Sequence, residues 1–426
     1  MSLGARRLGA ALAGLALAGT LAAAAALGAG QSGPPGIAKL KLGPALRQAE
    51  EILTYSRSQL LLLSDVEKSG IMRVDNRGKL DRSFGEDGKL AVSYTTAVVA
   101  PGGKILLVSN DAPPGDPGNA DAEVRRLLPD GRPDRSFGQD GTTFVDFGGR
   151  YDRGQTATVA PNGEILLGGV KTTYLGNRSP SDATQAVARL RPNGALDRSF
   201  GRDGVRILHG GSEGGTFDIA LAPSGEIVVE GEAELGTAIW KLRADGSLDR
   251  GFGKRGLVKI EGRGKRVGFG REESIDLVGK VGVTDKGKIV LAGTGSSESG
   301  DHTSYRAIAV RLLPNGKIDR SYGTAGWARA QIDGSTFAEA MALLPGGVVF
   351  VAASAQFNHD NRSDIGAVVF DRNGKPDPRF GNRGRFHVNL AGWDLSEDVA
   401  AQAGRAVILG EPGKGRIPWL VTAAPH

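Results

Sequence analysis

One segment of the chain matches a pattern used by serine nucleophiles. Gly210–Gly214 has the spacing G-x-S-x-G, in which the serine lies on a sharp turn between a strand and a helix, and His209 precedes it. Ser212 instead lies in a glycine-rich connection between two predicted strands, and no helical pattern follows. The match therefore does not indicate a nucleophile, and we assign no catalytic residue.

Histidine ligands for a metal are also scarce. The chain has 5 histidines, and no two of them have the spacing of metal ligands. His302 and His359 follow equivalent strands of neighbouring repeats, beside Asp301 and Asp360. These two loops either approach each other on one rim or are separate and solvated. We assign no metal-ligating and no cofactor-binding residue, and the ligand-binding residues stay unknown.

Six aspartates recur at one place in a repeated pattern, three residues after a glycine: Asp81, Asp134, Asp197, Asp249, Asp319 and Asp377. Calcium loops also combine Asp or Asn with a central Gly, but they supply six to eight oxygens and end in a Glu. Each copy here offers one or two side-chain oxygens. We interpret the aspartates as caps of backbone N–H groups in a turn, with structural calcium as the alternative.

The aspartates belong to a signature, G-x-x-D-x-x-(F/Y)-G-x-x-G, whose aromatic residues are Phe84, Phe137, Phe200, Phe252, Tyr322 and Phe380. Successive aromatics are 53, 63, 52, 70 and 58 residues apart. Constant units joined by variable loops indicate a stacked or radial repeat. We expect each aromatic to pack between repeats. We also expect the arginine that follows five of the six aspartates to pair with an acidic group of a neighbouring repeat.

Three strand patterns precede each signature and one follows it. A short apolar run, such as the segment from Glu164, comes after a tight turn and another strand, which is the pattern of a β-hairpin. A third strand leads into the signature and a fourth leaves it. Four antiparallel strands in about 50 to 60 residues are one blade of a β-propeller. Seven copies of the apolar run and of the third strand predict an all-β, seven-bladed propeller.

The seventh blade lacks a fourth strand in the sequence, because the chain ends soon after Pro418–Thr422. The alternating segment Ile37–Leu42 precedes the first complete hairpin. We predict that it pairs antiparallel with Pro418–Thr422 and closes the ring, which would cover an open sheet edge.

The signature series and the hairpins resemble the delta-60 repeat family, a group of exported bacterial β-propeller proteins. The resemblance covers about residues 36 to 426. It implies a propeller fold and an exported context, and it implies no catalytic residues or cofactor.

The N-terminus has the layout of a secretory signal peptide. Arg6 and Arg7 precede the uncharged Ala/Gly/Leu run Leu8–Leu27. We predict a signal peptide over residues 1–30 and one propeller domain over residues 31–426, secreted or extracytoplasmic. The alternative is a membrane anchor formed by an uncleaved N-terminal segment.

Composition limits the partners. The chain has no cysteine, so disulfides do not stabilise it, and its formal charge of +6 falls to +4 without Arg6 and Arg7. This excess is too small to indicate nucleic-acid binding. The basic run of Lys259, Arg263, Lys265, Arg266 and Arg271 either meets an anionic surface or is a solvated loop. We expect a monomer without a membrane span after signal cleavage.

Function is expected in the loops opposite the signatures, because variable loops on a fixed scaffold are where recognition residues gather. Those loops contain Tyr174, His302, Tyr305 and His359. The first hypothesis is a non-catalytic binding or scaffold protein with an extracellular protein or glycan partner. The second is an extracellular hydrolase or lyase acting on a polysaccharide, which would need two carboxylates about 5 to 9 Å apart at the central channel.

Overall fold

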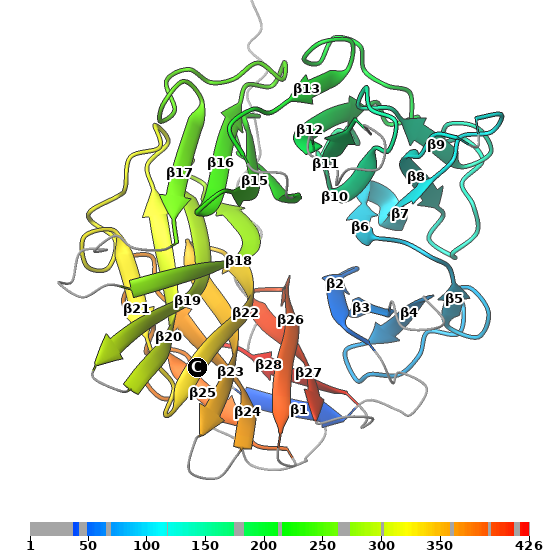
Figure 1. Ribbon diagram of the computed structural model, residues 1–426. Coiled ribbons are helices and arrows are strands. Elements are labelled where there is room, and N and C mark those ends of the chain that lie inside the picture. Colours follow the sequence, from blue (N-terminus) through cyan, green and yellow to red (C-terminus); the bar gives the residue numbers. More distant parts are fainter. Residues whose placement is uncertain are drawn as a thin grey trace, which may run out of the picture.

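Seven four-stranded antiparallel sheets surround a central opening, which confirms the predicted seven-bladed β-propeller (Figure 1). The computed structural model describes residues 37–41, 49–64, 70–116, 118–173, 183–211, 215–262, 273–299, 302–357, 362–390, 393–412 and 418–425. Ser212, the predicted signal peptide and four residues of the basic run lie outside the described residues: Arg263, Lys265, Arg266 and Arg271. Within the described part, no helix has the length and apolar character needed to cross a membrane.

The first four blades follow the chain in order. Blade 1 consists of β2 (Glu51–Thr54), β3 (Gln59–Ser64), β4 (Gly70–Asp75) and β5 (Lys89–Ala91). Blade 2 consists of β6 (Thr96–Ala100), β7 (Lys104–Asp111), β8 (Asp121–Leu127) and β9 (Thr142–Val145), with the 3-10 turn η3 (Pro101–Gly103) after β6. Blade 3 consists of β10 (Arg153–Val159), β11 (Ile165–Thr172), β12 (Ala183–Leu190) and β13 (Val205–Ile207). Blade 4 consists of β14 (Thr216–Leu221), β15 (Ile227–Ala233), β16 (Gly236–Leu242) and β17 (Leu257–Glu261).

The last three blades complete the ring. Blade 5 consists of β18 (Glu273–Val283), β19 (Ile289–Ser299), β20 (His302–Leu312) and β21 (Trp327–Ala330). Blade 6 consists of β22 (Ser335–Leu344), β23 (Val348–Phe357), β24 (Arg362–Phe370) and β25 (Arg385–Val388). Blade 7 consists of β26 (Asp394–Gln402), β27 (Arg405–Pro412), β28 (Trp419–Ala423) and the N-terminal β1 (Ile37–Lys41).

The first and last described strands are neighbours in blade 7. β1 pairs antiparallel with β28, with Ile37 opposite Ala423 and Lys41 opposite Trp419. This is the partner segment that the sequence predicts. That this pairing holds the ring shut stays a prediction.

The hydrophobic core is divided among the junctions between blades. One cluster joins Leu106 and Val124 of blade 2 to Leu167 of blade 3, with the signature residue Phe137 fully buried among them. Phe84 is buried in the same way between blades 1 and 2. The expected packing of the signature aromatics between repeats is therefore confirmed.

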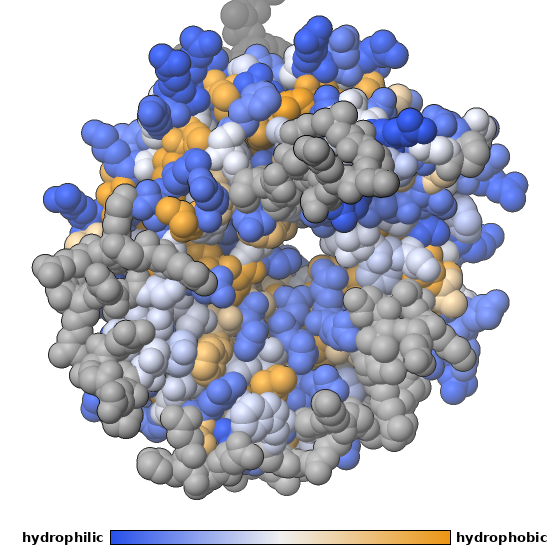
Figure 2. Space-filling model, viewed as in Figure 1, coloured by the Kyte–Doolittle hydropathy of each residue, from blue (hydrophilic) through white to orange (hydrophobic). Residues whose placement is uncertain are grey.

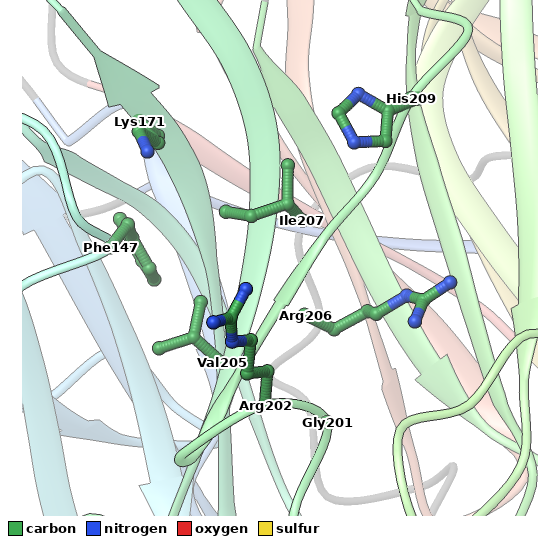
Figure 3. A pocket seen from close by; sticks show the side chains of 8 residues that line it. All are labelled: Phe147, Lys171, Gly201, Arg202, Val205, Arg206, Ile207 and His209. Atoms are coloured by element: carbon green, nitrogen blue, oxygen red, sulfur yellow. The ribbon is translucent and has the colours of Figure 1, made fainter.

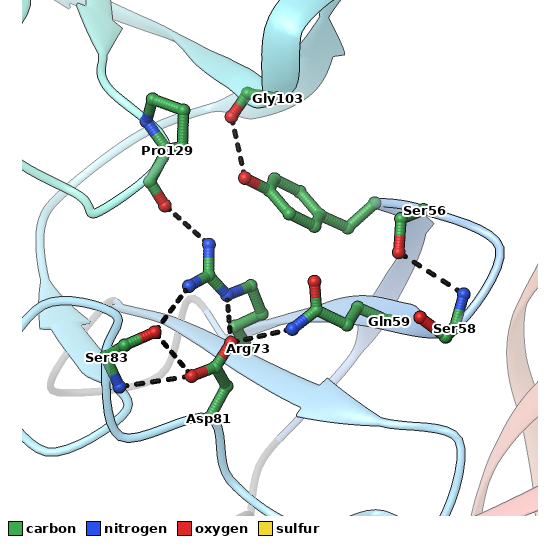
Figure 4. Close-up of polar contacts among 9 residues, drawn as sticks. Ser56, Ser58, Gln59, Arg73, Asp81, Ser83, Gly103 and Pro129 are labelled. Carbon is green, nitrogen blue, oxygen red and sulfur yellow. Dashed lines mark hydrogen bonds and ion pairs between the residues drawn. The ribbon is translucent and has the colours of Figure 1, made fainter.

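The signature aspartates cap turns, as predicted. In blade 1, Asp81 Oδ1 accepts hydrogen bonds from the Ser83 backbone N–H (3.1 Å) and hydroxyl (2.6 Å), and Asp81 Oδ2 accepts one from Arg73 (3.0 Å) (Figure 4). The same cap, from the backbone N–H two residues later, is present in the other five signatures: Asp134, Asp197, Asp249, Asp319 and Asp377.

Neighbouring signatures are also bonded to each other. The Gly85 N–H donates to the Asp130 carbonyl of the next blade at 2.8 Å. Arg73 donates to the carbonyl of Pro129 in that next blade (Figure 4). The Arg73 guanidinium lies 4.9 Å from the Phe84 ring centroid, within the range of a cation–π contact. The glycine link recurs at four further junctions: Gly138 to Asn193, Gly201 to Asp245, Gly253 to Asn315 and Gly323 to Asn373.

The arginine that makes this junction is not the one that the sequence suggested. Arg82, directly after Asp81, pairs with Asp87 of its own turn at 3.3 Å, and both side chains are largely exposed. The expectation of an acidic partner in a neighbouring blade was therefore wrong for Arg82. The Asp81 side chain turns inward to cap backbone, so the next side chain points to solvent. The junction arginine comes from the third strand of the blade, and its acceptor in the next blade is a carbonyl.

Candidate functional site

The loop residues expected to bind a ligand do not form a described site. Tyr174 and His359 lie outside the described residues, and so does the side chain of His302. Tyr305 lies in β20 and not in a loop, and its ring is 4.6 Å from that of Phe337 in blade 6. Its assignment to a recognition loop was wrong, because the strand pairing of β19 with β20 continues to His302.

The innermost strands show one position that differs in character from blade to blade. On each of these strands, one buried apolar residue is paired with a buried residue of the second strand, as Ile219 is with Val229. The residue that directly precedes this apolar residue occupies an equivalent position in every blade. We call these seven residues the inner ring: Glu51, Thr96, Thr156, Asp218, Lys280, Ala340 and Asp398. Successive innermost strands contact one another around the opening, so these residues form one layer of the channel wall.

Two of the inner-ring carboxylates bind across blade junctions. Asp218 Oδ2 accepts the backbone N–H of Val281 in blade 5 at 3.0 Å. Asp398 Oδ2 accepts the backbone N–H of Ile52 in blade 1 at 3.1 Å. The ring residues Lys280 and Glu51 immediately precede these two donors, so each lies beside a carboxylate of the preceding blade.

Glu230 adds a carboxyl behind the ring. It lies directly opposite Asp218 in the pairing of β14 with β15, and it is 0% exposed. Neither of its carboxyl oxygens has a hydrogen-bond partner. The six equivalent positions in the other blades are apolar or small: Leu63, Val108, Gly168, Ala292, Ala352 and Leu409. A carboxyl at this place therefore departs from what the blade packing requires.

The pKa values of the carboxyl groups in and behind the inner ring are raised. Burial, and then the charge of Asp398, raises the pKa of Glu51 to about 7. Burial, and then the charge of Asp218, raises the pKa of Glu230 to about 8. Burial also raises the pKa of Asp218 and of Asp398.

Lys280 is the cation among these acids. Burial by itself would lower its pKa, but the negative charges of Asp218, Asp398, Glu51 and Glu230 together raise it. Lys280 lies where the register of β18 shifts between Leu277 and Val281, so it stands outside the regular pairing with β19. One lysine can neutralise only one of the four groups when they are ionised, and at neutral pH a bound proton keeps Glu230 largely uncharged.

Two β-bulges place further acids next to the inner ring. Register shifts in β22 and β26 leave Glu339 and Glu397 as the unpaired residues directly before Ala340 and Asp398 of the inner ring. Burial raises the pKa of both groups, and the charges of Glu339 and Asp398 add to the rise for Glu397. Hydrophilic residues border much of the central opening in Figure 2. We call Glu51, Asp218, Glu230, Lys280, Glu339, Glu397 and Asp398 the acidic channel cluster.

A different group of acids is the only described set of three that lies close enough to share a metal ion. The ligand atoms of Asp121, Asp146 and Asp152 all lie within 4.8 Å of one another. Asp152 is fully buried, and its carboxylate also accepts the backbone N–H groups of Gly149 and Thr172, each at 3.1 Å. The acidic channel cluster is more widely spaced than this triad, so it suits a ligand with several polar groups better than one bare ion.

The arrangement allows two kinds of chemistry. An excess of carboxylates over one lysine attracts positively charged groups. A carboxyl whose pKa is near 7, such as Glu51, can also donate or accept a proton at neutral pH. Sequence reasoning missed the cluster because its members lie in different blades. Aligning the innermost strands by their apolar residue would have exposed them as charged residues in a register otherwise filled by Thr and Ala.

Comparison with known proteins agrees with the fold. A family model described as "Domain of unknown function (DUF5122) beta-propeller" matches residues 160–200, 222–252 and 287–322. Each stretch ends at a signature aromatic: Phe200, Phe252 and Tyr322. No curated protein matches the chain in sequence.

Similar solved structures differ widely in what they do. A puromycin hydrolase is 15% identical with a TM-score of 0.47, and the alignment covers 86% of this chain and 51% of the hydrolase, so this chain spans about half of that protein. A polysaccharide lyase, Uly1, is 11% identical with a TM-score of 0.43, over 89% of this chain and 90% of the lyase. Domains 1–2 of Drosophila semaphorin 1b are 9% identical with a TM-score of 0.43, over 91% of this chain and 86% of that one. These similarities assign no activity. The matched stretches lie in blades 3 to 5 and agree with the β-propeller fold that the seven sheets show.

Proposed function

We propose that this protein is a non-catalytic binding propeller that takes positively charged groups of its ligand into the central channel. The observation that supports the proposal is the acidic channel cluster, which has six carboxyl groups from four blades and one lysine. Four of the carboxyl groups act on Lys280, and Glu339 and Glu397 extend the cluster beside Asp398. Three of the six sit in the inner ring, and a structural ring position would not need charge, because Thr96, Thr156 and Ala340 occupy it in other blades. Ammonium groups of a peptide or of an amino sugar fit this chemistry.

Titration with a simple polyamine tests the proposal. We expect spermidine to bind the full chain at low ionic strength, measured by calorimetry, and a neutral polyether of similar length not to bind. Glu397→Gln and Glu339→Gln, which keep the side-chain shape, should weaken binding by about tenfold each. The matched control is Glu86→Gln, an exposed carboxylate of a signature. Equal weakening by the control, or none by the channel variants, would refute a channel site.

A second candidate function is supported by one observation. Glu51 has a pKa of about 7 at the channel wall, which suits a general acid or base. If the protein is a polysaccharide hydrolase or lyase, Glu51→Gln should abolish depolymerisation of an accepted glycan while leaving glycan binding intact. Binding without any depolymerisation across a glycan panel would favour the non-catalytic function.

We further propose that the protein acts outside the cytoplasm, as the resemblance to the delta-60 repeat family and the run Leu8–Leu27 suggest. Cell fractionation and N-terminal sequencing of the exported protein test this. A new N-terminus near residue 31 would support cleavage. Retention of Met1 in a membrane fraction would support the anchored alternative, and an intact cytoplasmic protein would refute export.

A further inference from the structure

A pocket on the outer side of blade 3 has a chemistry opposite to that of the channel. It has a volume of about 470 Å³, within the range of about 300 to 1,000 Å³ usual for small-molecule sites. Phe147, just after the last strand of blade 2, forms one wall, and the other walls come from blade 3: Lys171, Gly201, Arg202, Val205, Arg206, Ile207 and His209 (Figure 3).

The basic side chains of this pocket are not neutralised. Its lining has no carboxylate, and Lys171, Arg202 and Arg206 form no ion pair with any residue that the structure describes. The Nε atom of Arg206 is buried without a hydrogen-bond partner. By contrast, the junction arginines Arg126 and Arg189 each bind a signature aspartate, at 2.8 and 2.7 Å. The pocket therefore keeps positive charge that the fold elsewhere pairs with acids.

Apolar surface lies between two of the cations. In Figure 3, Phe147, Val205 and Ile207 lie between Lys171 above and Arg202 below, whereas Arg206 and His209 lie on the other side of β13. Gly148 leaves room for the Lys171 ammonium group, since a Cβ at Gly148 would come within 3.3 Å of Lys171 Nζ. An anion with an apolar body could thus contact the three apolar side chains while its charged group reaches one of the two cations.

The equivalent place between blades 5 and 6 shows that the repeat does not require this chemistry. That pocket contains Ile332 where blade 2 has Phe147, and Asn382 where blade 3 has Arg202. It also includes the acid Asp333, and its His387 pairs with Asp364 at 2.6 Å. That pocket also contains Arg383 and Arg385, which form no ion pair with any described residue. The blade 3 pocket therefore differs in that no carboxylate lies in the same lining as its basic side chains.

We propose that the blade 3 pocket binds a small organic anion with an apolar portion, such as an aromatic carboxylate or sulfonate, through Lys171 and Arg202. This site is independent of the channel, because none of its lining residues belongs to the acidic channel cluster. A ligand of this class would not compete with a polyamine in the channel.

Binding of naphthalene-2-sulfonate to the full chain, measured by ligand-observed NMR and calorimetry, tests the proposal. We expect Lys171→Met and Arg202→Gln each to weaken binding by about tenfold. The matched control is Lys254→Gln, because Lys254 is the exposed basic residue at the position of Arg202 in the signature of blade 4. This control should bind like the wild type.

Two further probes separate charge from apolar contact. Naphthalene-2-methanol, which is neutral, and inorganic phosphate, which has no apolar body, should both bind more weakly than the sulfonate. Equal binding of the neutral probe would overturn the role of the cations, and equal binding of phosphate would overturn the role of the apolar wall. Unfolding curves of both variants show whether they fold; two folded variants that bind as the wild type does would refute the site.

Discussion

The outer signatures and the inner ring of this propeller differ in how strictly their residues are repeated from blade to blade. At the signatures, six aspartates make the same backbone cap, and the glycine link is repeated at five blade junctions. At the inner ring, one structural position is occupied by Glu, Thr, Thr, Asp, Lys, Ala and Asp. Repetition marks what every blade needs in order to fold. Because the inner-ring residues are not repeated, folding of the blades does not require their side chains, and they can contact a ligand instead.

An exception among the signatures shows what the repeated arrangement must provide. In blade 6 the junction arginine of the third strand is replaced by Val369. There, Arg379 within the signature itself binds Asp377 at 2.6 Å. In blade 4 the arginine is replaced by Lys241, which lies 3.3 Å from Asp249. Each signature aspartate therefore keeps a cation, although the cation's position in the chain changes.

The largest effect on stability should come from removing the buried aromatic side chain of a signature. Phe200 is fully buried between blades 3 and 4, so Phe200→Ala should lower the free energy of unfolding by about 3 to 5 kcal/mol. Arg198→Ala in the same signature is the control, because Arg198 is exposed and should change stability by less than about 0.5 kcal/mol. Urea unfolding measures both. A similar loss of stability in both variants would mean that burial of the aromatic side chain is not what the signature contributes to the fold.

A smaller effect is expected at the junction that has no signature. Blade 7 relies on the pairing of β1 with β28, and a chain starting at residue 42 would leave the edge of β28 open. Compared with a chain starting at residue 37, we expect a loss of about 2 to 3 kcal/mol, from a few backbone hydrogen bonds. The open edge should also promote self-association, visible in light scattering. Equal stability and no self-association would show that β1 does not close the ring.

The acidic channel cluster should respond to pH in a way that the signatures do not. The pKa of Glu230 is raised from 4.5 to about 8, so between these values the folded state keeps a proton that the unfolded chain loses. Stability therefore falls as the pH rises through this window. Glu230→Gln removes the loss, and we expect the variant to match the wild type at pH 4 and to exceed it at pH 9 by a few kcal/mol, on the order of the pKa shift.

Glu226 provides the opposite case for the same measurement. Hydrogen bonds from Ser224 and Lys241 lower its pKa, so its contribution to stability is present above the unfolded pKa and is lost as the pH falls. Glu226→Gln should therefore be less stable than the wild type at neutral and alkaline pH. If Glu230→Gln behaves like Glu226→Gln, Glu230 has a partner that compensates its charge, and Asp218 and Lys280 do not surround it as described.

The sequence could predict the repeated part of the molecule and little of the rest. Blade number, strand order and the capping role of Asp81 follow from short-range patterns that recur six times. The acidic channel cluster depends on residues from blades 1, 4, 5, 6 and 7, and its members meet only once the ring is formed. The junction role of Arg73 was equally hidden, because Arg73 lies eight positions before its aspartate while a second arginine, Arg82, lies directly after it.

The smallest effect should be that of a chelator on the signatures. Asp134 Oδ2 accepts Arg126 at 2.8 Å and Lys104 at 2.7 Å, and Asp134 Oδ1 accepts the Ser136 hydroxyl at 2.6 Å. Burial would raise the pKa of Asp134, but hydrogen bonds from Lys104 and Ser136 and the charge of Arg126 hold it well below its usual range. Such a carboxylate has no free oxygen for calcium, and two cations beside it repel a third.

We therefore expect EDTA to leave the thermal unfolding midpoint unchanged. A fall in the midpoint would contradict this prediction, and a variant of the Asp121–Asp146–Asp152 triad would then identify where the metal binds. If EDTA lowers the midpoint and Asp146→Asn removes that response, the metal belongs to the triad, and the signatures remain caps. If the response survives Asp146→Asn, calcium binds at the signatures, and their repetition would reflect a shared ligand and not a shared turn.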